Sequence, residues 1–262
     1  MANDPPAEGG DFAGIEILEE GIRLLCKNDS DAQRLLAPRS ETIIPLLCAY
    51  IAEIEAFNPA CGLVGTNDRK ELIIRHILDS LAPLGIFYRL LKEQNAGEIP
   101  AIADAGSGAG LPGIPLAIAL PQVNFTLIER MKRRADFLRH AQKTLALPNV
   151  TVLEDEMEKY AHNLITKNHS VSNRFALVTF RAFRAFEPKI VRGLFRLCAG
   201  GGLLAAYKGR RAKIEQEIAA LEKFFNGEGR KSTIRLSGCE VIPCPTPLLD
   251  EERHILIIRV SP

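Results

Sequence analysis

The chain has 262 residues and a net charge of +1, with 47% hydrophobic residues, 25% charged residues and a mean hydropathy of +0.02. This balance excludes wholesale disorder, a fibrous repeat and a long coiled coil. No apolar run approaches the roughly 18 residues of a membrane-spanning helix, and residues 1–10 are too acidic and proline-rich for a signal peptide. The sequence thus predicts a soluble, cytoplasmic protein that needs no membrane.

The six cysteines are scattered, and only Cys239 and Cys244 come close together in the sequence. Their spacing fits neither a zinc site nor a disulfide framework, so we expect free thiols and no metal. The charge is unevenly distributed, because residues 1–129 carry 9 Lys/Arg against 18 Asp/Glu, whereas residues 130–262 carry 24 against 14. The basic second half is suited to a polyanion such as RNA.

Apolar periodicity predicts a helical N-terminal part that ends at a polar boundary near residues 93–98. In Thr42–Phe57 and Glu71–Leu81 the apolar residues recur at intervals of three and four, as in amphipathic helices, and Asp68 is placed to cap the second. We therefore divide the chain into an extension of unknown role (residues 1–40), a helical part (41–98) and a second domain (99–262).

From residue 99 onward, short aliphatic runs alternate with helical periods. Strands are expected at Ala101–Ala103, Phe125–Ile128, Val150–Leu153, Phe175–Thr179 and Leu203–Tyr207. Helices are expected near Pro112–Ala119, Met131–Leu145, Glu187–Leu197 and Arg211–Phe225. The alternation predicts a doubly wound α/β fold with a parallel sheet. Thr233–Ile242 and His254–Val260 have no helix between them and predict an antiparallel hairpin at the sheet edge.

The strongest motif is the glycine-rich segment Asp104–Gly113, directly after the first expected strand. Glycines let the backbone approach a ligand closely, and Glu129 at the next strand end is placed to bind both ribose hydroxyls of an adenosine-type ligand. The spacing D-x-G-x-G-x-G favours S-adenosylmethionine, whose ammonium and sulfonium groups an acid can face. The glycines also spell G-x-G-x-x-G, so NAD is an alternative, as is a purely structural turn.

Six segments between about Tyr50 and Val260 stand in a characteristic order and spacing. They are Arg75–Leu81, Asp104–Pro115, Arg133–Leu138, Arg181–Ala182, Lys208–Gly209 and Glu252–His254. Together they resemble the GidB/RsmG family, bacterial methyltransferases that modify nitrogen 7 of a guanine, nucleotide 527, in a decoding-region loop of 16S ribosomal RNA. The resemblance implies a class I, Rossmann-like methyltransferase fold behind a helical N-terminal segment, with S-adenosylmethionine as cofactor.

The resemblance also implies residue roles, with the glycine loop on the methionine portion of the cofactor, Glu129 on its ribose and Asp155–Met157 beside its adenine. The expected cofactor-binding residues are Asp104, Gly106, Ser107, Gly108, Gly110, Leu111, Glu129, Asp155, Glu156, Met157 and Arg181. The chain departs from the family pattern at Glu156, where a basic residue is common. It also departs at Phe57-Asn58-Pro59, where Trp-Asn-Lys is often found, and in a longer connection over residues 161–174.

Methylation of guanine nitrogen 7 needs no catalytic base, because this nitrogen has a free lone pair and carries no proton. Catalysis then rests on aligning nitrogen, methyl carbon and sulfur. Arg181 and Lys208 follow the ends of expected parallel strands and are candidates for positioning the substrate through phosphate or oxygen 6, since contact with nitrogen 7 would block it. The alternative interpretation is that both residues are ordinary solvated charges at strand ends.

The RNA-binding candidates are Arg75, His76, Arg133, Arg134, Arg184 and Arg210. A basic helix from Arg130 to Lys143 and the aromatic and cationic run Phe180–Phe186 add to them, although a solvated face and core phenylalanines explain these patterns equally. His254 is expected to be structural. The expected partner is 16S ribosomal RNA or the small ribosomal subunit, and we favour a monomer. An NAD-dependent oxidoreductase and a non-enzymatic RNA-binding or assembly factor are the alternative functions.

Overall fold

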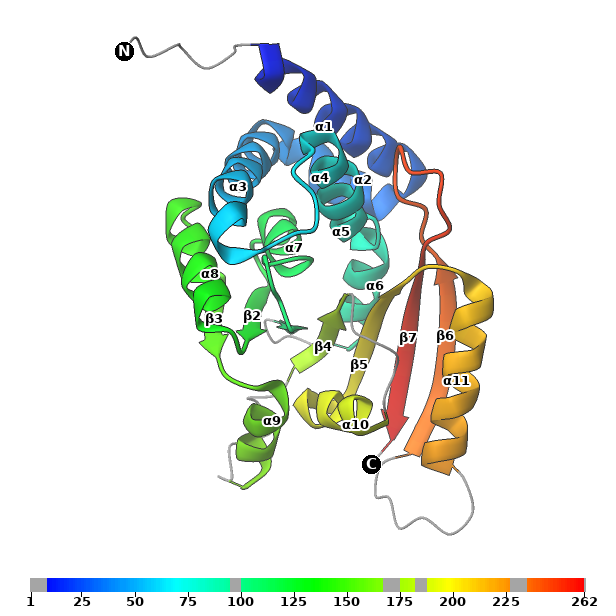
Figure 1. The fold of residues 1–262 in the computed structure, drawn as a ribbon. Helices are drawn as coiled ribbons and strands as arrows, with labels where there is room; N and C mark the ends of the chain where they lie inside the picture. Colours follow the sequence, from blue (N-terminus) through cyan, green and yellow to red (C-terminus); the bar gives the residue numbers. More distant parts are fainter. Residues whose placement is uncertain (1–8, 95–99, 167–174, 182–187, 227–234, 262) are drawn as a thin grey trace.

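The computed structural model describes residues 9–94, 100–166, 175–181, 188–226 and 235–261. Its centre is a seven-stranded sheet in the order β3-β2-β1-β4-β5-β7-β6 (Figure 1). The strands are β1 Ala101–Ala105, β2 Asn124–Glu129, β3 Val150–Glu154, β4 Phe175–Phe180, β5 Cys198–Lys208, β6 Arg235–Pro243 and β7 His254–Ser261. Each strand that the sequence predicts is present, and the α/β fold class is confirmed.

Strands β1 to β5 run parallel to one another, whereas β7 is antiparallel to both β5 and β6. Parallel strands need a long crossover, and a helix lies between each of the first five strands and the next. Strands β6 and β7 are joined by a short connection without a helix, which allows antiparallel pairing. The predicted hairpin is thus confirmed, with β6 at the sheet edge and β7 between β6 and β5.

Helices cover both faces of the sheet because successive strand side chains point to opposite faces. Ile102 and Leu177 belong to one buried core and Ala103 and Val178 to the other. The first core holds the N-terminal helices with α7 (Gly113–Ala119) and α8 (Lys132–Thr144), and the second holds α9 (Met157–Thr166), α10 (Pro188–Leu197) and α11 (Arg211–Asn226).

The N-terminal part is helical, as predicted. Its elements are α1 Gly9–Asn28, α2 Ser30–Leu36, the short η1 Ala37–Arg39, α3 Ser40–Cys61, α4 Arg69–Leu72, the π-helical η2 Ile73–Leu78, α5 Asp79–Leu81 and α6 Leu84–Gln94. Asp68 caps α4 by accepting the Glu71 N–H at 2.6 Å, which confirms the expected cap. Leu18, Ile22 and Leu25 of α1 are buried, so these residues of the expected extension belong to the first core.

Helix α3 is longer than the sequence predicts. It continues through Pro59, which was expected in a loop, and ends at Gly62, whose left-handed φ of +57° suits glycine. Within the described residues, the stretch Ser30–Cys61 is long and apolar enough to cross a membrane, which corrects the expectation that no such run exists. Core helices of globular proteins pass the same test, and Leu47, Tyr50 and Ile54 of this stretch are buried in the first core.

Candidate functional site

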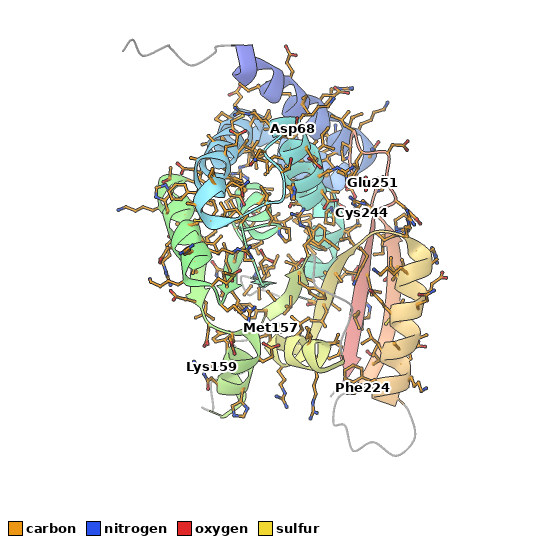
Figure 2. The ribbon with its side chains drawn as sticks, viewed as in Figure 1. Asp68, Met157, Lys159, Phe224, Cys244 and Glu251 are labelled. Atoms are coloured by element: carbon orange, nitrogen blue, oxygen red, sulfur yellow. The ribbon has the colours of Figure 1, made fainter. Side chains whose placement is uncertain are left out.

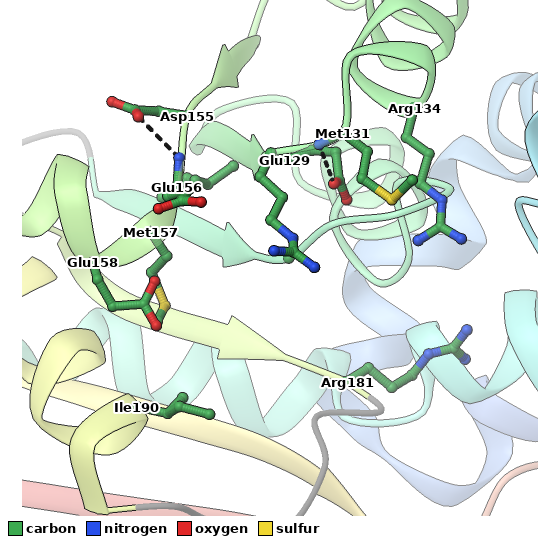
Figure 3. Close-up of a pocket in the computed structure, with 12 residues that line it drawn as sticks. Glu129, Met131, Arg134, Asp155, Glu156, Met157, Glu158, Arg181 and Ile190 are labelled. Atoms are coloured by element: carbon green, nitrogen blue, oxygen red, sulfur yellow. Dashed lines mark hydrogen bonds between the residues drawn. The ribbon is translucent and has the colours of Figure 1, made fainter.

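A cavity of about 680 Å³ opens at the carboxyl ends of β1, β2, β3 and β4 (Figure 3). This edge is where open α/β sheets bind ligands. The cavity is lined by Gly106, Ile128, Glu129, Arg130, Met131, Arg134, Asp155, Glu156, Met157, Glu158, Arg181 and Ile190. Six of the expected cofactor-binding residues are in this lining, namely Gly106, Glu129, Asp155, Glu156, Met157 and Arg181.

The other five expected cofactor residues are not part of the cavity lining. Asp104, one of the five, holds the glycine loop that supports this lining. Its Oδ2 atom accepts hydrogen bonds from the Ser107 hydroxyl at 2.6 Å and the Gly113 N–H at 3.0 Å. Asp104 is 1% exposed, so its carboxylate faces the loop and not the cavity. These bonds fix the turn that carries Gly108, Gly110 and Leu111. Direct contact of these five with a cofactor stays a prediction.

Burial raises the pKa of Asp104 from 3.8 to about 6. Because the folded-state value is the higher one, the folded protein retains a proton that the unfolded chain releases, and stability is lost as the pH rises from about 4 to about 6. We expect Asp104→Asn to abolish this pH dependence. As the pH rises through this range, the free energy of unfolding of the variant should increase by about 3 kcal/mol relative to that of the unaltered protein. Urea denaturation across this range measures it, and Asp136→Asn at the surface is the control. Parallel pH profiles for the Asp104 variant and the unaltered protein would contradict the expectation.

Most backbone N–H groups of the glycine loop are bonded within the protein. Gly106 and Ser107 donate to the Ile128 carbonyl at 2.9 and 3.0 Å, and Gly108 donates to Glu129 Oε2 at 2.9 Å. Gly110 and Leu111 donate to the Ser107 carbonyl. A dinucleotide loop offers such N–H groups to a pyrophosphate, but here they are engaged beside a carboxylate. The loop therefore suits a ligand with positive charge better than a pyrophosphate.

Glu129 combines loop support with access to the cavity. Its second oxygen, Oε1, accepts the Met131 N–H at 2.8 Å, so the carboxylate is fixed from both sides. Each carboxylate oxygen has two lone pairs and can accept a further bond from a ribose hydroxyl. The geometry therefore fits the ribose contact that the sequence predicts.

Arg181, directly after β4, is held by the N-terminal helices. Its Nη1 donates to the Arg75 carbonyl and to Asp79 Oδ2, both at 3.2 Å, and its Nη2 donates to His76 Nδ1 at 2.8 Å. Burial, and then the nearby Arg181 charge, lower the pKa of His76 from 6.5 to about 4. At neutral pH, His76 is thus an uncharged acceptor that orients Arg181.

From sequence, Asp79, with Arg75 and His76, is expected either to face the cofactor cleft or to hold the helical part against the sheet. It is 6% exposed and also accepts hydrogen bonds from Thr246 Oγ1 at 2.9 Å and Arg253 Nε at 3.1 Å. It therefore joins α5 to the end of β4 and to the connection between β6 and β7. Its place in the Arg75–Leu81 segment was the available signal.

The remaining candidates are dispersed. Lys208 lies outside the cavity lining and pairs with Glu217 of α11 at 2.8 Å, and burial lowers the Lys208 pKa while this hydrogen bond opposes the change. Arg75 pairs with Glu251, which lies beside the N-terminal helices (Figure 2). His254 Nδ1 lies 2.7 Å from the Gly209 carbonyl oxygen, a hydrogen bond consistent with a structural role.

Of the other RNA-binding candidates, Arg133 and Arg210 are exposed, and Arg134 reaches from the cavity to the Gly62 carbonyl at 2.8 Å. Arg184 and most of the run Phe180–Phe186 lie outside the described residues. The six cysteines are free thiols, and no cluster of three His, Cys, Asp or Glu side chains suited to a metal occurs in the described part of the chain.

Comparison with known proteins gives the same fold and a family. The ribosomal RNA small subunit methyltransferase G of Treponema denticola is 35% identical over 273 residues, covering 95% of this chain and 96% of the relative. The same-named protein of Nitrosococcus oceani is 30% identical, with 95% and 96% covered. Among solved structures, the O-methyltransferase TomG of Streptomyces achromogenes, in complex with S-adenosylmethionine, has a TM-score of 0.51 at 13% identity, covering 83% of this chain and 90% of its own.

A family model described as GidB, rRNA small subunit methyltransferase G, matches residues 43–239. Together with the class I methyltransferase fold and the internally bonded glycine loop, this match identifies S-adenosylmethionine as the cofactor and removes the NAD alternative. The segments that suggested the family from sequence lie in this range, apart from Glu252–His254. The chain belongs to the GidB family.

Proposed function

We propose that this protein transfers a methyl group from S-adenosylmethionine to nitrogen 7 of a guanine in 16S ribosomal RNA, at nucleotide 527 of the decoding-region loop. The observation that carries the proposal is the similarity, over 95% of the chain, to proteins named ribosomal RNA small subunit methyltransferase G. It acts on the RNA or the small ribosomal subunit in the cytoplasm, as a monomer.

The cavity supports this proposal because it offers positive and negative side chains to two reactants of opposite charge. S-adenosylmethionine supplies the electrophilic methyl group. Arg130, Arg134 and Arg181 contribute guanidinium groups to the lining, and these suit the phosphates or the oxygen 6 atom of a guanine nucleotide.

Arg181 is suited to hold guanine without blocking its nucleophile. Both protons of its Nη1 and one of Nη2 are committed to Arg75, Asp79 and His76, so its remaining N–H groups are those available to a substrate. One of these can donate to oxygen 6 while nitrogen 7 keeps its lone pair for the methyl group. No proton has to be moved, so the task of these residues is alignment.

The test uses small-subunit RNA that lacks the modification, purified protein and S-adenosylmethionine with a labelled methyl group. We expect one labelled nucleotide, 7-methylguanosine at position 527. A label on another base or another RNA would overturn the specificity. RNA binding without any methyl transfer, to naked RNA or to subunits, would instead favour a non-enzymatic assembly factor.

A further inference from the structure

Two acidic and two basic side chains of the cavity lie on opposite sides. Glu156 and Glu158 come from the connection between β3 and α9 and from the first turn of α9, whereas Arg134 comes from α8 and Arg181 follows β4. Figure 3 shows the two glutamates on one side of the cavity and both of these arginines on the other. We call Glu156 and Glu158 the acidic rim.

The acidic rim forms no ion pair within the described part of the protein. Asp155, its neighbour, pairs with Lys159 at 3.6 Å, and Glu129 accepts two backbone N–H groups. Neither Glu156 nor Glu158 has an ion-pair partner among the described residues, and both are exposed at the cavity. Two carboxylates that have no ion-pair partner in the described part of the chain therefore face the cavity.

The methyl donor and its product differ mainly in charge. S-adenosylmethionine carries a sulfonium, an ammonium and a carboxylate group, for a net charge of +1, whereas S-adenosylhomocysteine has lost the sulfonium charge with the methyl group and is neutral overall. A carboxylate about 8 Å from the sulfonium raises the affinity for the charged ligand about two-fold at the dielectric constant of water. At half that dielectric constant the factor is about five-fold. In shape the two ligands differ by only one methyl group, so the shape of the pocket alone distinguishes them less.

We propose that Glu156 and Glu158 are specificity-determining residues that make the cavity bind the cationic methyl donor more tightly than its neutral product. The inference rests on the proposed function only in its use of S-adenosylmethionine, and not on the RNA target. Transfer of the methyl group removes the charge that the acidic rim attracts, so the product leaves more readily.

Isothermal titration of the purified, full-length protein tests the proposal without any methyl transfer. Three ligands are compared: S-adenosylmethionine, S-adenosylhomocysteine and sinefungin, in which an amine-bearing carbon replaces the sulfonium and keeps a positive charge. We expect Glu156→Gln and Glu158→Gln each to weaken binding of the two cationic ligands two- to five-fold, while the affinity for S-adenosylhomocysteine stays unchanged. Added salt should reduce the preference of the unaltered protein for the cationic ligands.

Glu154→Gln is the matched control, because Glu154 precedes the same turn, lies outside the cavity lining and is bound to Arg139 at 2.9 Å. It should leave the ratio of affinities unchanged. Equal weakening of all three ligands by the rim variants, or an unchanged ratio in the Glu156→Gln/Glu158→Gln double variant, overturns the proposal and leaves the proposed function intact. If the unaltered protein binds none of the three ligands, both fail. The substituted side chains are exposed, and melting temperatures verify that the variants fold.

Discussion

Replacing Asp79 by alanine is expected to lower the free energy of unfolding by about 3 to 5 kcal/mol. The change removes a carboxylate that is 6% exposed and leaves Arg181 and Arg253, whose side chains are 15% and 23% exposed, without their shared anion. Urea denaturation measures the loss. Glu20→Ala, which breaks an exposed pair with Arg23, should change stability little and serves as the control.

The same variant is expected to reduce methyl transfer, because Arg181 lines the cavity and loses its anchor. A displacement of about 1 Å can cost a hundred-fold in rate, so we expect kcat to fall at least about ten-fold at a temperature where the variant is folded. Affinity for S-adenosylmethionine should change less than kcat. Asp79→Asn keeps an acceptor for Arg181 and should be intermediate. Full activity of folded Asp79→Ala would show that Arg181 needs no support from α5.

Replacing Gly113 by alanine is expected to damage the cofactor site. An added Cβ would collide with the Leu127 side chain and lie 2.8 Å from Asp104 Oδ2, the atom that accepts the Gly113 N–H. Relief requires α7 or the loop to shift, at a cost of about 1 to 3 kcal/mol in stability.

The expected readout is at least a ten-fold weaker affinity for both S-adenosylmethionine and S-adenosylhomocysteine, measured by titration calorimetry. Equal weakening separates this effect from that of the acidic rim, which acts on charge. Gly65→Ala is the matched control, because the added Cβ meets nothing within 4 Å. Unchanged affinities in Gly113→Ala would show that the loop tolerates the collision without moving its ligand-facing side.

The sequence predicted the sheet well because its inner strands are short aliphatic runs buried on both faces. It also placed Glu129 and the glycine loop at the correct edge, since the carboxyl ends of parallel strands meet there. It missed α9, which begins directly after the acidic turn at Asp155 and Glu156. Apolar residues of this segment do recur at helical spacing, at Met157, Tyr160, Ala161, Leu164 and Ile165, so the pattern was present and was read as a connection.

The contacts that orient the site were beyond the reach of local pattern. Asp79 meets Arg181 and Thr246 across 102 and 167 residues of sequence, and only tertiary packing brings these segments together. Likewise, an acid at the end of the first strand suggested a ligand contact for Asp104. Its burial and its hydrogen bonds to Ser107 and Gly113, which hold the loop, depend on the folded turn and could not be seen in that pattern.

The insertion of β7 between β5 and β6 constrains how a newly synthesised chain completes its sheet. While translation proceeds from Lys208 to His254, at about 5 to 20 residues per second, β5 has an open edge for a few seconds. Strand β6 emerges first but must leave that edge free for the later strand. A transcript cut short before residue 254 would therefore yield a polypeptide with a permanently unpaired hydrophobic edge, a substrate for chaperones, proteases or aggregation.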